Sequence, residues 1–564
     1  MNSLVILIVG IALLFIGYVT YGSWLAKQWG VDPKKATPAH TLEDGTDYVP
    51  AKAPVLLGHH FASIAGAGPI NGPIQAAIFG WVPVFLWVVI GGIFFGAVQD
   101  FSSLLASIRH QGKSIGHVIE VNVGKKAKKL FLIFSYLTLL LVVAAFASIV
   151  VSTFVGFGAD GAINLPNGRT ASISMLFIVV SIIFGGMVYR RNAPLSIATI
   201  AGIAGIIACI AIGYNLPVFL SANTWMAIVL AYIFVASVTP VWILLQPRDY
   251  LNSFLLYGMM IAAAVGIVVA HPTVQLPAFN GFVVGGVSGF ASGTLFPVLF
   301  ITVACGAISG FHSLVGSGTS SKQLDKETDA KLIGYGGMLI ECGLAIISLI
   351  CVGILYADGT MPTGSPTVIF ATGIATMLKS VNASYEIAYS IIILSVSAFC
   401  LTSLDTATRL ARYMFQEFFI AEGQDRSELT GYKKFLSNPY VATAITVVIG
   451  GAMAVGGYAK IWPLFGAANQ LLAALALLAV AAWLGNIGKN NKMFLFPMGF
   501  MLCATISSLI LTLQAKITAL ASGKGTISSD GLQVFFAALL VVLAVDLAFE
   551  GIKTLKNKKP AESK

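Results

Sequence analysis

Two glycine-rich stretches that also carry histidine and serine are the part of this sequence best suited to bind a small molecule. The first reads GHHFASIAGAGP over residues 58–69, and the second reads GFHSLVGSGT over residues 310–319. Residues 63–68 and 313–318 match in order as small polar, aliphatic, small, glycine, small and glycine. Irregular backbone lies at membrane depth only where protein or a water-filled cavity satisfies its amides. The repeated pattern therefore predicts two interrupted helices around a permeation site.

The chemistry expected at these stretches is recognition of a carboxylate. Free amides at the start of a half-helix favour an anion, and glycine lets a ligand approach the backbone closely. Histidine titrates near neutral pH, which a proton-coupled carrier requires of at least one group. We therefore predict substrate-binding roles for His59, His60, Ser63, Gly66, Gly68, Asn71, His312, Ser313, Gly316, Ser317 and Gly318.

Two alternative interpretations of these stretches stay open. Glycines at such spacing also let membrane helices pack closely without binding anything. His59 and His60 are equally consistent with caps at the inner start of a helix, and Lys322 and Lys326 indicate that His312 lies close to water.

Three acidic residues within apolar segments are candidates for ion coupling, because a carboxylate in hydrocarbon is costly. Glu341 is the deepest in its segment, whereas Asp100 and Asp405 lie near inner helix ends. Hydroxyl-rich surroundings suit either a proton or Na⁺ at such a group. The local alternatives are an ion pair of Asp405 with Arg409 and a contact of Asp100 with Ser103 or Arg109.

Two further polar pairs interrupt apolar segments. Arg248 and Asp249 stand at an inner helix end, where an ion pair would brace a gate or simply anchor the helix at the interface. Asn469 and Gln470 lie deep in a later segment, and we expect them to form hydrogen bonds between helices.

The composition places the chain in a membrane. Of its 564 residues, 57% are hydrophobic and 10% are charged, which leaves too little charge for the surface of a soluble fold. The fold class we expect is an all-α polytopic membrane protein, with an inverted-repeat core that contains discontinuous helices. About fifteen apolar segments are long enough to span a bilayer, at residues 4–26, 55–77, 79–105, 130–156, 171–189, 194–214, 224–246, 254–270, 293–312, 332–357, 386–408, 440–457, 461–485, 493–515 and 531–550. A further piece at 364–378 is expected to be re-entrant or interfacial.

The basic residues predict an orientation for these segments. With the amino terminus outside, all but five of the 33 Lys and Arg residues fall on inner connections. An odd number of crossings then puts the carboxyl terminus in the cytoplasm. The net charge of +10 is explained by this topology and by anionic lipid at the inner face, so it gives no reason to invoke nucleic acid.

Other function classes find no support in the sequence. A GxxxxGK[ST] motif is absent, and the six cysteines stand singly in apolar segments without metal-site spacing. The first apolar segment lacks a basic leader and a cleavage site, so we expect a retained helix. We expect no enzyme activity, no metal and no cofactor other than the coupling ion, H⁺ or Na⁺. A carrier driven by an ion gradient remains, with a channel or a nutrient sensor as the alternative.

Four stretches carry a resemblance to a known family: residues 58–73, 99–101, 246–251 and 311–319. They resemble the carbon starvation protein A (CstA) family, and the resemblance covers essentially the whole chain. It implies a bacterial or archaeal inner-membrane carrier associated with peptide uptake under carbon limitation, in a family with some members that import pyruvate by proton symport. It also implies a core of the amino acid/polyamine/organocation type. Peptide and pyruvate stay open as substrates, as does the oligomeric state.

We predict three parts of the chain and one mechanism. Residues 1–385 hold both interrupted helices, residues 386–551 form a region of five spans, and residues 552–564 form a basic cytoplasmic tail. The segment at 55–77 runs from inside to outside and that at 293–312 runs from outside to inside, so inversion relates the two breaks. Inverted repeats place such breaks against one another near the bilayer midplane. We expect alternating access, in which a substrate carboxylate and the coupling ion are neutralised together.

Overall fold

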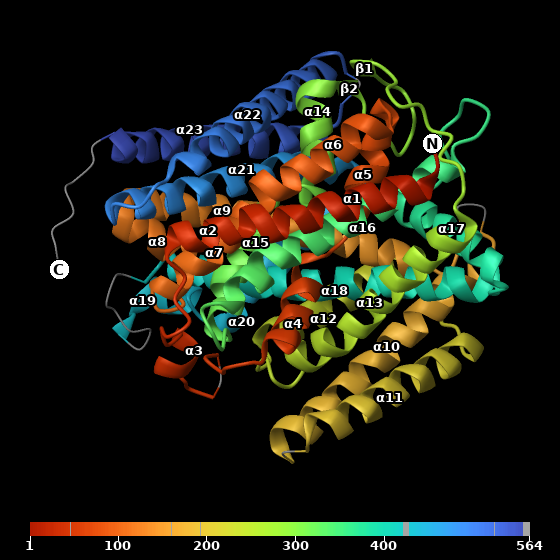
Figure 1. The fold of residues 1–564 in the computed structure, drawn as a ribbon, viewed down its shortest axis with the longest axis horizontal. Helices are drawn as coiled ribbons and strands as arrows, with labels where there is room; N and C mark the ends of the chain where they lie inside the picture. Colours follow the sequence, from red (N-terminus) through yellow and green to blue (C-terminus); the bar gives the residue numbers. More distant parts are fainter. Residues whose placement is uncertain (46, 159–160, 192, 421–427, 524, 557–564) are drawn as a thin grey trace.

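The computed structural model describes residues 1–45, 47–158, 161–191, 193–420, 428–523 and 525–556. Most of these residues are helical, and most of the long helices run along one common direction (Figure 1). The helices are α1 Ser3–Gly17, α2 Ser23–Trp29, α3 Pro38–Thr41, α4 Ala53–Ile64, α5 Gly68–Ala76, α6 Trp81–Gly91, α7 Ala97–Arg109, α8 Ile115–Asn122, α9 Lys125–Phe154, α10 Leu165–Gly185, α11 Leu195–Asn215, α12 Ala222–Val238, α13 Leu245–Ala270, α14 Leu295–Val303, α15 Gly310–Gly318, α16 Gly337–Leu355, α17 Pro366–Leu378, α18 Tyr385–Glu417, α19 Gly431–Leu436, α20 Pro439–Ala454, α21 Tyr458–Asn486, α22 Lys492–Ala521 and α23 Leu532–Lys556. Two short strands, β1 Val283–Val284 and β2 Gly293–Thr294, pair antiparallel. The predicted all-α class is confirmed.

Helix length and composition identify a multi-pass membrane protein. Among the described residues, twelve helical segments are long and apolar enough to cross a bilayer, and three apolar helices are shorter. Each predicted span coincides with one of these segments or, at 55–77, with α4 and α5 together. The total of fifteen is not confirmed, because the spans at 55–77, 224–246 and 440–457 fall on helices below that length.

Two of the helices are interrupted in the middle. α4 ends where Ala65 leaves the helical conformation (φ −77°, ψ 61°), and α5 begins again with Pro69 in its first turn. α14 ends at Ala304, whose positive φ of 44° is uncommon for a residue with a side chain. A short 3₁₀ turn, Ala304–Gly306, and three irregular residues lead from there to α15. Irregular backbone thus divides each helix into two halves.

The two interrupted helices lie side by side and run in opposite directions. The start of α4 lies beside the end of α15, where Ala51 forms a bridge with Leu324. The start of α14 lies beside the end of α5, where the Ala291 amide donates to the Gln75 carbonyl at 3.0 Å. α5 packs against α14, and α4 packs against α15. The predicted inversion of the two segments is therefore confirmed.

The same inversion relates the surrounding helices. The contact of α5 with α16 corresponds to the contact of α15 with α7. Likewise, the contacts of α9 with α20 and α21 correspond to those of α18 with α12 and α13. α9 and α18 lie along each other in opposite directions, since Lys128 near the start of α9 is 3.5 Å from Glu417 at the end of α18. We therefore pair α4 and α5 with α14 and α15, and α6 and α7 with α16. In the same way we pair α9 with α18, α12 with α20, and α13 with α21.

The remaining helices lie around this core. α1 and α2 precede it, α22 and α23 follow it, and α10 and α11 form a hairpin that projects from one side of the molecule (Figure 1). The piece predicted at 364–378 is α17, which packs against α5, α13, α16 and α18. The division of the chain at residues 385 and 551 stays a prediction, and residues 557–564 of the predicted tail lie outside the described residues.

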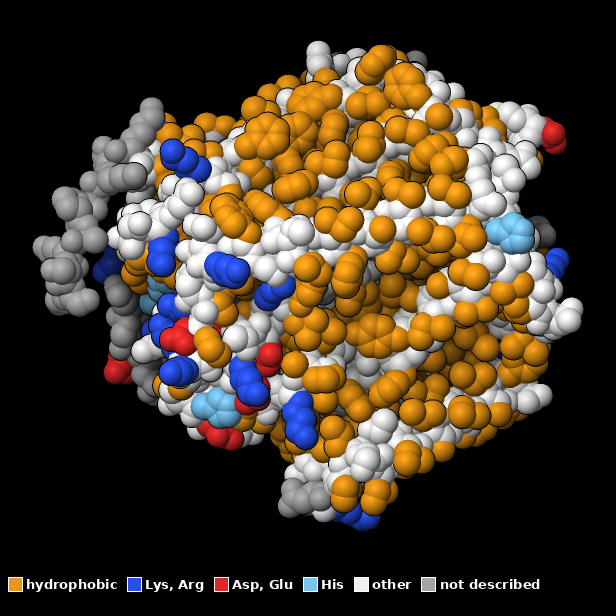
Figure 2. Space-filling view, in the orientation of Figure 1, with side chains coloured by type: hydrophobic (Ala, Val, Ile, Leu, Met, Phe, Trp, Pro, Cys, Tyr) orange, Lys and Arg blue, Asp and Glu red, His pale blue; other side chains and the backbone are white. Residues whose placement is uncertain are grey.

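Charge is distributed unevenly between the two ends of the molecule. On the face shown in Figure 2, Lys and Arg side chains gather at the end where α23 finishes, and hydrophobic side chains cover the belt between the ends. α1 begins at the opposite end (Figure 1). We call the Lys- and Arg-rich end, which includes Lys128 at the start of α9 and Lys322 after α15, the basic end. This asymmetry is what the positive-inside rule requires of one membrane face.

Gly72 allows the two interrupted helices to cross, and its replacement tests the crossing. A Cβ at Gly72 would lie 2.2 Å from the backbone oxygen of Val303, which cannot move aside as a side chain can. We expect Gly72→Ala to lower the free energy of unfolding by about 1–3 kcal/mol, measured as a lower melting temperature in detergent. The control is Gly343→Ala, where a Cβ would meet nothing within 4 Å. Equal melting temperatures for the two variants would show that the helices do not cross at Gly72.

Candidate functional site

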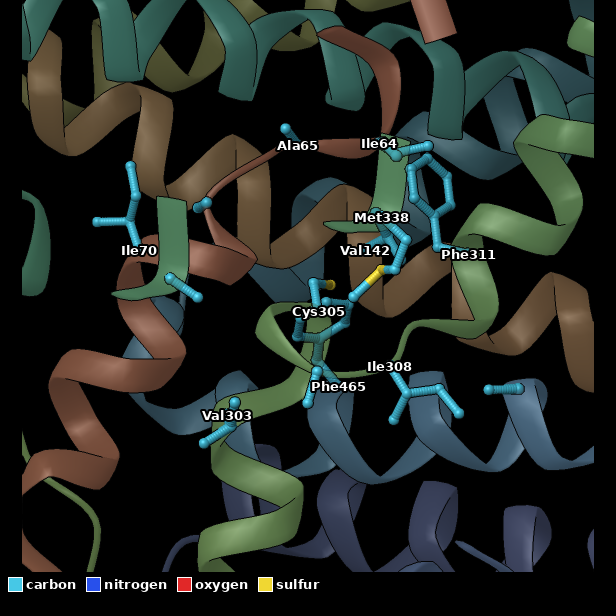
Figure 3. Packing of buried hydrophobic residues seen from close by; sticks show 14 of the residues in the cluster. Ile64, Ala65, Ile70, Val142, Val303, Cys305, Ile308, Phe311, Met338 and Phe465 are labelled. Carbon is cyan, nitrogen blue, oxygen red and sulfur yellow. The ribbon is translucent and has the colours of Figure 1, made fainter. Parts of the chain in front are cut away.

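The two breaks meet inside the protein at Gly68 and Cys305. A Cβ on Gly68 would lie 2.4 Å from the Cβ of Cys305, so the first turn of α5 touches the turn between α14 and α15. Figure 3 shows Cys305 with the side chains of Met338 and Phe465 close by, and all three belong to one buried apolar cluster. The breaks therefore face each other, as predicted, and apolar side chains pack closely around them.

The second break lies upstream of the stretch predicted from the sequence. Residues 310–318 form α15, and the irregular backbone covers residues 304–309 instead. A Cβ on Gly310 would lie 2.3 Å from the carbonyl oxygen of Asn469, so this glycine serves close packing of α15 on α21. The hydroxyls of Ser313 and Ser317 donate to carbonyls of their own helix at 2.6 Å. Matching residues 313–318 to residues 63–68 as a second break was therefore wrong.

Two predicted coupling residues and one predicted substrate-binding residue form one buried charge cluster. Nδ1 of His312 lies 2.8 Å from Oδ2 of Asp100, and Nε2 of the same ring lies 3.3 Å from Oε2 of Glu341. None of the three side chains is more than 1% exposed. They come from α15, α7 and α16, so the cluster joins the second interrupted helix to two neighbouring helices. His312 is therefore deeply buried, contrary to the prediction that it lies close to water.

This central cluster carries a net charge whenever both of its carboxylates are ionised. With both carboxylates ionised, a neutral imidazole leaves two negative charges and a protonated imidazole leaves one. The two carboxylate oxygens of Glu341 have no hydrogen-bond partner among the described residues, and the same is true of Nε2 of His312. Buried groups of this kind are normally satisfied. The cluster is therefore suited to take up a proton or a ligand.

The second break is held in place by Asn469 of α21. Its amide oxygen accepts a hydrogen bond from the Phe311 amide at 2.8 Å, and its amide nitrogen donates to the Ser309 hydroxyl at 3.1 Å. The same nitrogen lies 3.4 Å from the sulfur of Cys305. The predicted role of Asn469 in bonding between helices is confirmed.

A small ion would find three side chains near one point of the cluster. The Cys305 sulfur, a nitrogen of His312 and a carboxylate oxygen of Glu341 lie within 4.8 Å of one another. We nevertheless keep the expectation that no metal is required, because His312 and Glu341 already form an ion pair with each other.

A second buried charge network connects α4 with α12, α13 and α18. Arg248 pairs with Asp249 at 3.1 Å and with Asp405, and the Tyr232 hydroxyl donates to Asp405 at 2.7 Å. Nδ1 of His59 lies 3.4 Å from the second oxygen of Asp249. Arg248 is 1% exposed and both aspartates are fully buried. The predicted gate pair therefore shares one network with the third coupling candidate, and His59 connects it to the first interrupted helix.

The local alternatives for the acidic residues are wrong. Arg409 does not pair with Asp405, because its Nη2 donates to the carbonyls of Ala236, at 2.8 Å, and Thr239. Arg109 pairs with Glu327 through its Nε at 3.0 Å, whereas Asp100 pairs with His312.

Three predicted polar residues of the first interrupted helix lie close to the break. His60 is 1% exposed, and its Nδ1 lies 2.7 Å from the hydroxyl of Ser320. The carbonyl of Ser63 accepts a hydrogen bond from the hydroxyl of Ser403 at 3.0 Å. Asn71 is 1% exposed, and its amide oxygen has no hydrogen-bond partner among the described residues. Roles in substrate binding for these residues stay predictions.

The other predicted glycines lie against side chains. Gly66 lies against Phe146 and Ser403, Gly316 lies near Leu104, and Gly318 lies against Leu410. These positions agree with the alternative that the glycines permit close packing. Gly66 differs from the others because it lies in the break itself, within residues 65–67.

Sequence reasoning missed two residues that complete the clusters. Cys305 stands alone in an apolar segment, so the sequence suggested only a small buried side chain. Tyr232 lies in α12, and nothing in the sequence connects it with Arg248 and Asp405. Both became recognisable only from positions in space.

A hollow opens between α4, α13, α15 and α18 at the basic end, and we call it the vestibule. Its polar lining includes His59, Ser63, Gln246, Thr319, Lys322 and Arg409. Ser63 stands two residues before the irregular Ala65, so the vestibule extends from the basic end to the first break.

Comparison with known proteins gives a consistent assignment. The family model for carbon starvation protein CstA matches residues 2–368 and 357–508. The chain is similar to the peptide transporter CstA of Escherichia coli K12, with 32% identity that covers 99% of this chain and 92% of the relative. It is also similar to the peptide transporter CstA of Campylobacter jejuni, with 34% identity over 90% of this chain and 79% of the relative. A third relative is the pyruvate/proton symporter BtsT of Escherichia coli K12, with 32% identity over 84% of this chain and 76% of that protein.

Solved structures support the fold. A manganese transporter from Eremococcus coleocola superimposes with a TM-score of 0.50 at 11% sequence identity, covering 91% of this chain and 99% of that chain. At this identity the similarity concerns the fold, which is the inverted-repeat architecture described above.

Proposed function

This chain belongs to the carbon starvation protein CstA family, and we propose that it is a secondary active transporter that imports a small carboxylate-bearing nutrient, a peptide or pyruvate, together with a proton. We further propose that it works under carbon starvation in the bacterial inner membrane. The named activities of the relatives support this proposal, since they are peptide transport and pyruvate/proton symport.

One observation carries the proposal. Two interrupted helices of opposite direction meet at Gly68 and Cys305, and the cluster of Asp100, His312 and Glu341 is built on the second of them. Transporters with inverted repeats bind substrate and coupling ion where their interrupted helices meet.

The composition of the cluster favours a proton over Na⁺ as the coupling ion. Hard cations prefer a shell of oxygen ligands, whereas here an imidazole lies directly between two carboxylates. Histidine changes charge in the physiological pH range, so this arrangement suits a proton. The symport activity of the pyruvate-transporting relative points in the same direction.

Charge balance provides the coupling. With His312 protonated and both carboxylates ionised, the cluster carries one excess negative charge, and a carboxylate substrate alone would add another. A proton alone would leave the amides of the break without an anion. With both bound, the site carries one net negative charge instead of two, and the substrate carboxylate meets the break amides. Because an uncompensated buried charge is costly, the bound proton favours binding of the substrate, and linkage makes this effect reciprocal.

The vestibule supplies a route to one side of the membrane. We propose that the basic end faces the cytoplasm, as the positive-inside rule predicts, with the amino terminus outside. Substrate would then leave the breaks past Ser63 and enter the vestibule beside Arg409.

Transport by reconstituted protein tests the proposal. Proteoliposomes would be given an inward proton gradient or an inward Na⁺ gradient and offered labelled pyruvate or a labelled dipeptide. We expect a proton gradient to drive accumulation of at least one of these substrates, and a Na⁺ gradient at constant pH to have no effect. Uptake that is indifferent to the proton gradient would contradict proton symport, and the absence of saturable counterflow would contradict a carrier.

A further inference from the structure

We propose that the vestibule is a second carboxylate-binding site, anchored by Arg409, that holds the transported anion between the breaks and the basic end. Binding of a carboxylate there is independent of the coupling mechanism. Only the identification of the bound anion as the transported substrate rests on the function proposed above.

Arg409 offers donors that the protein does not use. The residue is 6% exposed and lines the vestibule. Its Nη2 donates to the carbonyls of Ala236 and Thr239 at the end of α12, but its Nε has no hydrogen-bond partner among the described residues. A guanidinium carries five N–H donors, and a buried unused donor is costly. A ligand oxygen in the vestibule would satisfy that donor.

The charge of the lining favours an anion. Lys322 adds a second cation to Arg409, whereas Asp47 is the one acidic residue among the described residues that line the hollow. The unused Nε–H of Arg409 can form a charge-assisted hydrogen bond with a carboxylate oxygen. The chemistry therefore points to a small carboxylate.

One face of α18 forms a continuous wall of the site. Thr406, Arg409, Leu410 and Tyr413 line the hollow at positions i, i+3, i+4 and i+7, which lie on one side of a helix. The face gives a ligand a hydroxyl and a guanidinium for its polar end and apolar surface for its carbon atoms. This combination suits a short organic anion better than an inorganic one.

The location connects the site to transport. Ser63 of α4 and Thr319 beside the end of α15 line the hollow together with residues of α13 and α18. Both interrupted helices and their scaffold therefore contribute, and the hollow reaches the first break. An anion that leaves the breaks toward the basic end meets Arg409 on its way.

The alternative is that Arg409 only caps the carboxyl-terminal end of α12. Cations near the last carbonyls of a helix are common and stabilising. Capping accounts for the bonds of Nη2 but not for the unpartnered Nε or for the presence of Lys322 in the same lining. Arg409→Lys separates the two roles, because lysine keeps the charge near the carbonyls but has no N–H donor at the position of Nε.

Protection of an introduced thiol tests the proposal locally. Thr319→Cys would be made in a Cys503→Ser background, because Cys503 is the exposed cysteine among the described residues. The rate of alkylation by a charged maleimide would be measured in detergent with increasing pyruvate, with pyruvamide as the uncharged analogue and chloride to match ionic strength. We expect pyruvate to slow the reaction and pyruvamide and chloride to leave it unchanged.

Substitutions identify the residue responsible. Arg409→Gln should raise the pyruvate concentration for half-protection by about tenfold or more, the loss expected for one hydrogen bond to a charged group. Arg409→Lys should raise it by a smaller factor while keeping the melting temperature of the parent protein. Arg412→Gln, on the same helix but outside the lining, should leave it unchanged.

Two outcomes would overturn the proposal. Protection that persists in both Arg409 variants would show that the anion binds elsewhere, and equal protection by pyruvamide would show that no carboxylate is recognised. Glu341→Gln separates this site from the central cluster: protection that survives in this variant, even if transport fails, supports an independent site. Protection lost in Glu341→Gln but kept in Arg409→Gln would assign the effect to the breaks.

Discussion

Glu341→Gln is expected to abolish accumulation of substrate against its gradient while leaving the protein folded. Glu341 is fully buried and lies 3.3 Å from Nε2 of His312, and neither of its oxygens makes a hydrogen bond within the described residues. Glutamine keeps the size of the side chain but neither ionises nor binds a proton in the relevant range. Accumulation driven by a proton gradient should fall to the level of protein-free vesicles, measured with labelled substrate in proteoliposomes.

Exchange without a gradient supplies the internal control. The amide of glutamine resembles the protonated acid, so the variant should still exchange labelled for unlabelled substrate across the membrane. Glu386→Gln is the matched control, because Glu386 is exposed and pairs with Arg169 at 2.6 Å away from the breaks. It should accumulate substrate normally. Normal accumulation by Glu341→Gln would move the coupling role to Asp100 or Asp405.

The sequence was a good guide to the helices because hydrocarbon imposes one strong requirement on them. A segment such as 130–156 must be apolar over its whole length, and that property is local and can be read from the residues. The inverted relation of residues 55–77 and 293–312 was also predicted correctly, because the direction of each segment follows from its basic flanks. The exact total was less secure, since α12, α17 and α20 are shorter than the other apolar helices.

The second break was misplaced because glycine has two uses in membrane helices. Gly66 lies in an interruption, whereas Gly310 begins α15 and makes room for the backbone of Asn469. The residues around them are similar, so composition cannot separate the two uses. The actual interruption begins at Ala304, whose strained backbone follows from tertiary packing rather than from its own residue type.

The candidate residues were identified individually, but their grouping was not. Asp100 and His312 are separated by more than 200 positions in the sequence and touch in space. From the sequence we assigned His312 to the substrate and Asp100 to the coupling ion, because no local feature shows which faces of two helices meet. The same applies to Arg248, whose second partner, Asp405, comes from a different repeat. Helix rotation and packing determine these pairs, and both depend on the whole core.

Arg248→Met is expected to destabilise the protein more than any other single change in its network. Arg248 is the cation between Asp249 and Asp405, and all three are almost completely buried. Methionine fills similar space but leaves two carboxylates without their main partner. Removal of one member of a buried ion pair typically costs about 3–5 kcal/mol. The free energy of unfolding in detergent should fall by this amount.

The order of stability among variants distinguishes charge from packing. Asp405→Asn should cost less than Arg248→Met, because Arg248 keeps Asp249 and the Tyr232 hydroxyl can still bond to the amide. The double variant Arg248→Met/Asp405→Asn should be more stable than Arg248→Met alone, since it removes one of the two uncompensated charges, with a coupling energy of about 1–3 kcal/mol. If the two single effects simply add, loss of packing volume explains the cost. A positive coupling would instead show that these residues act as one electrostatic unit, which is the property required of a gate that links α13 and α18 to His59 on the interrupted helix α4.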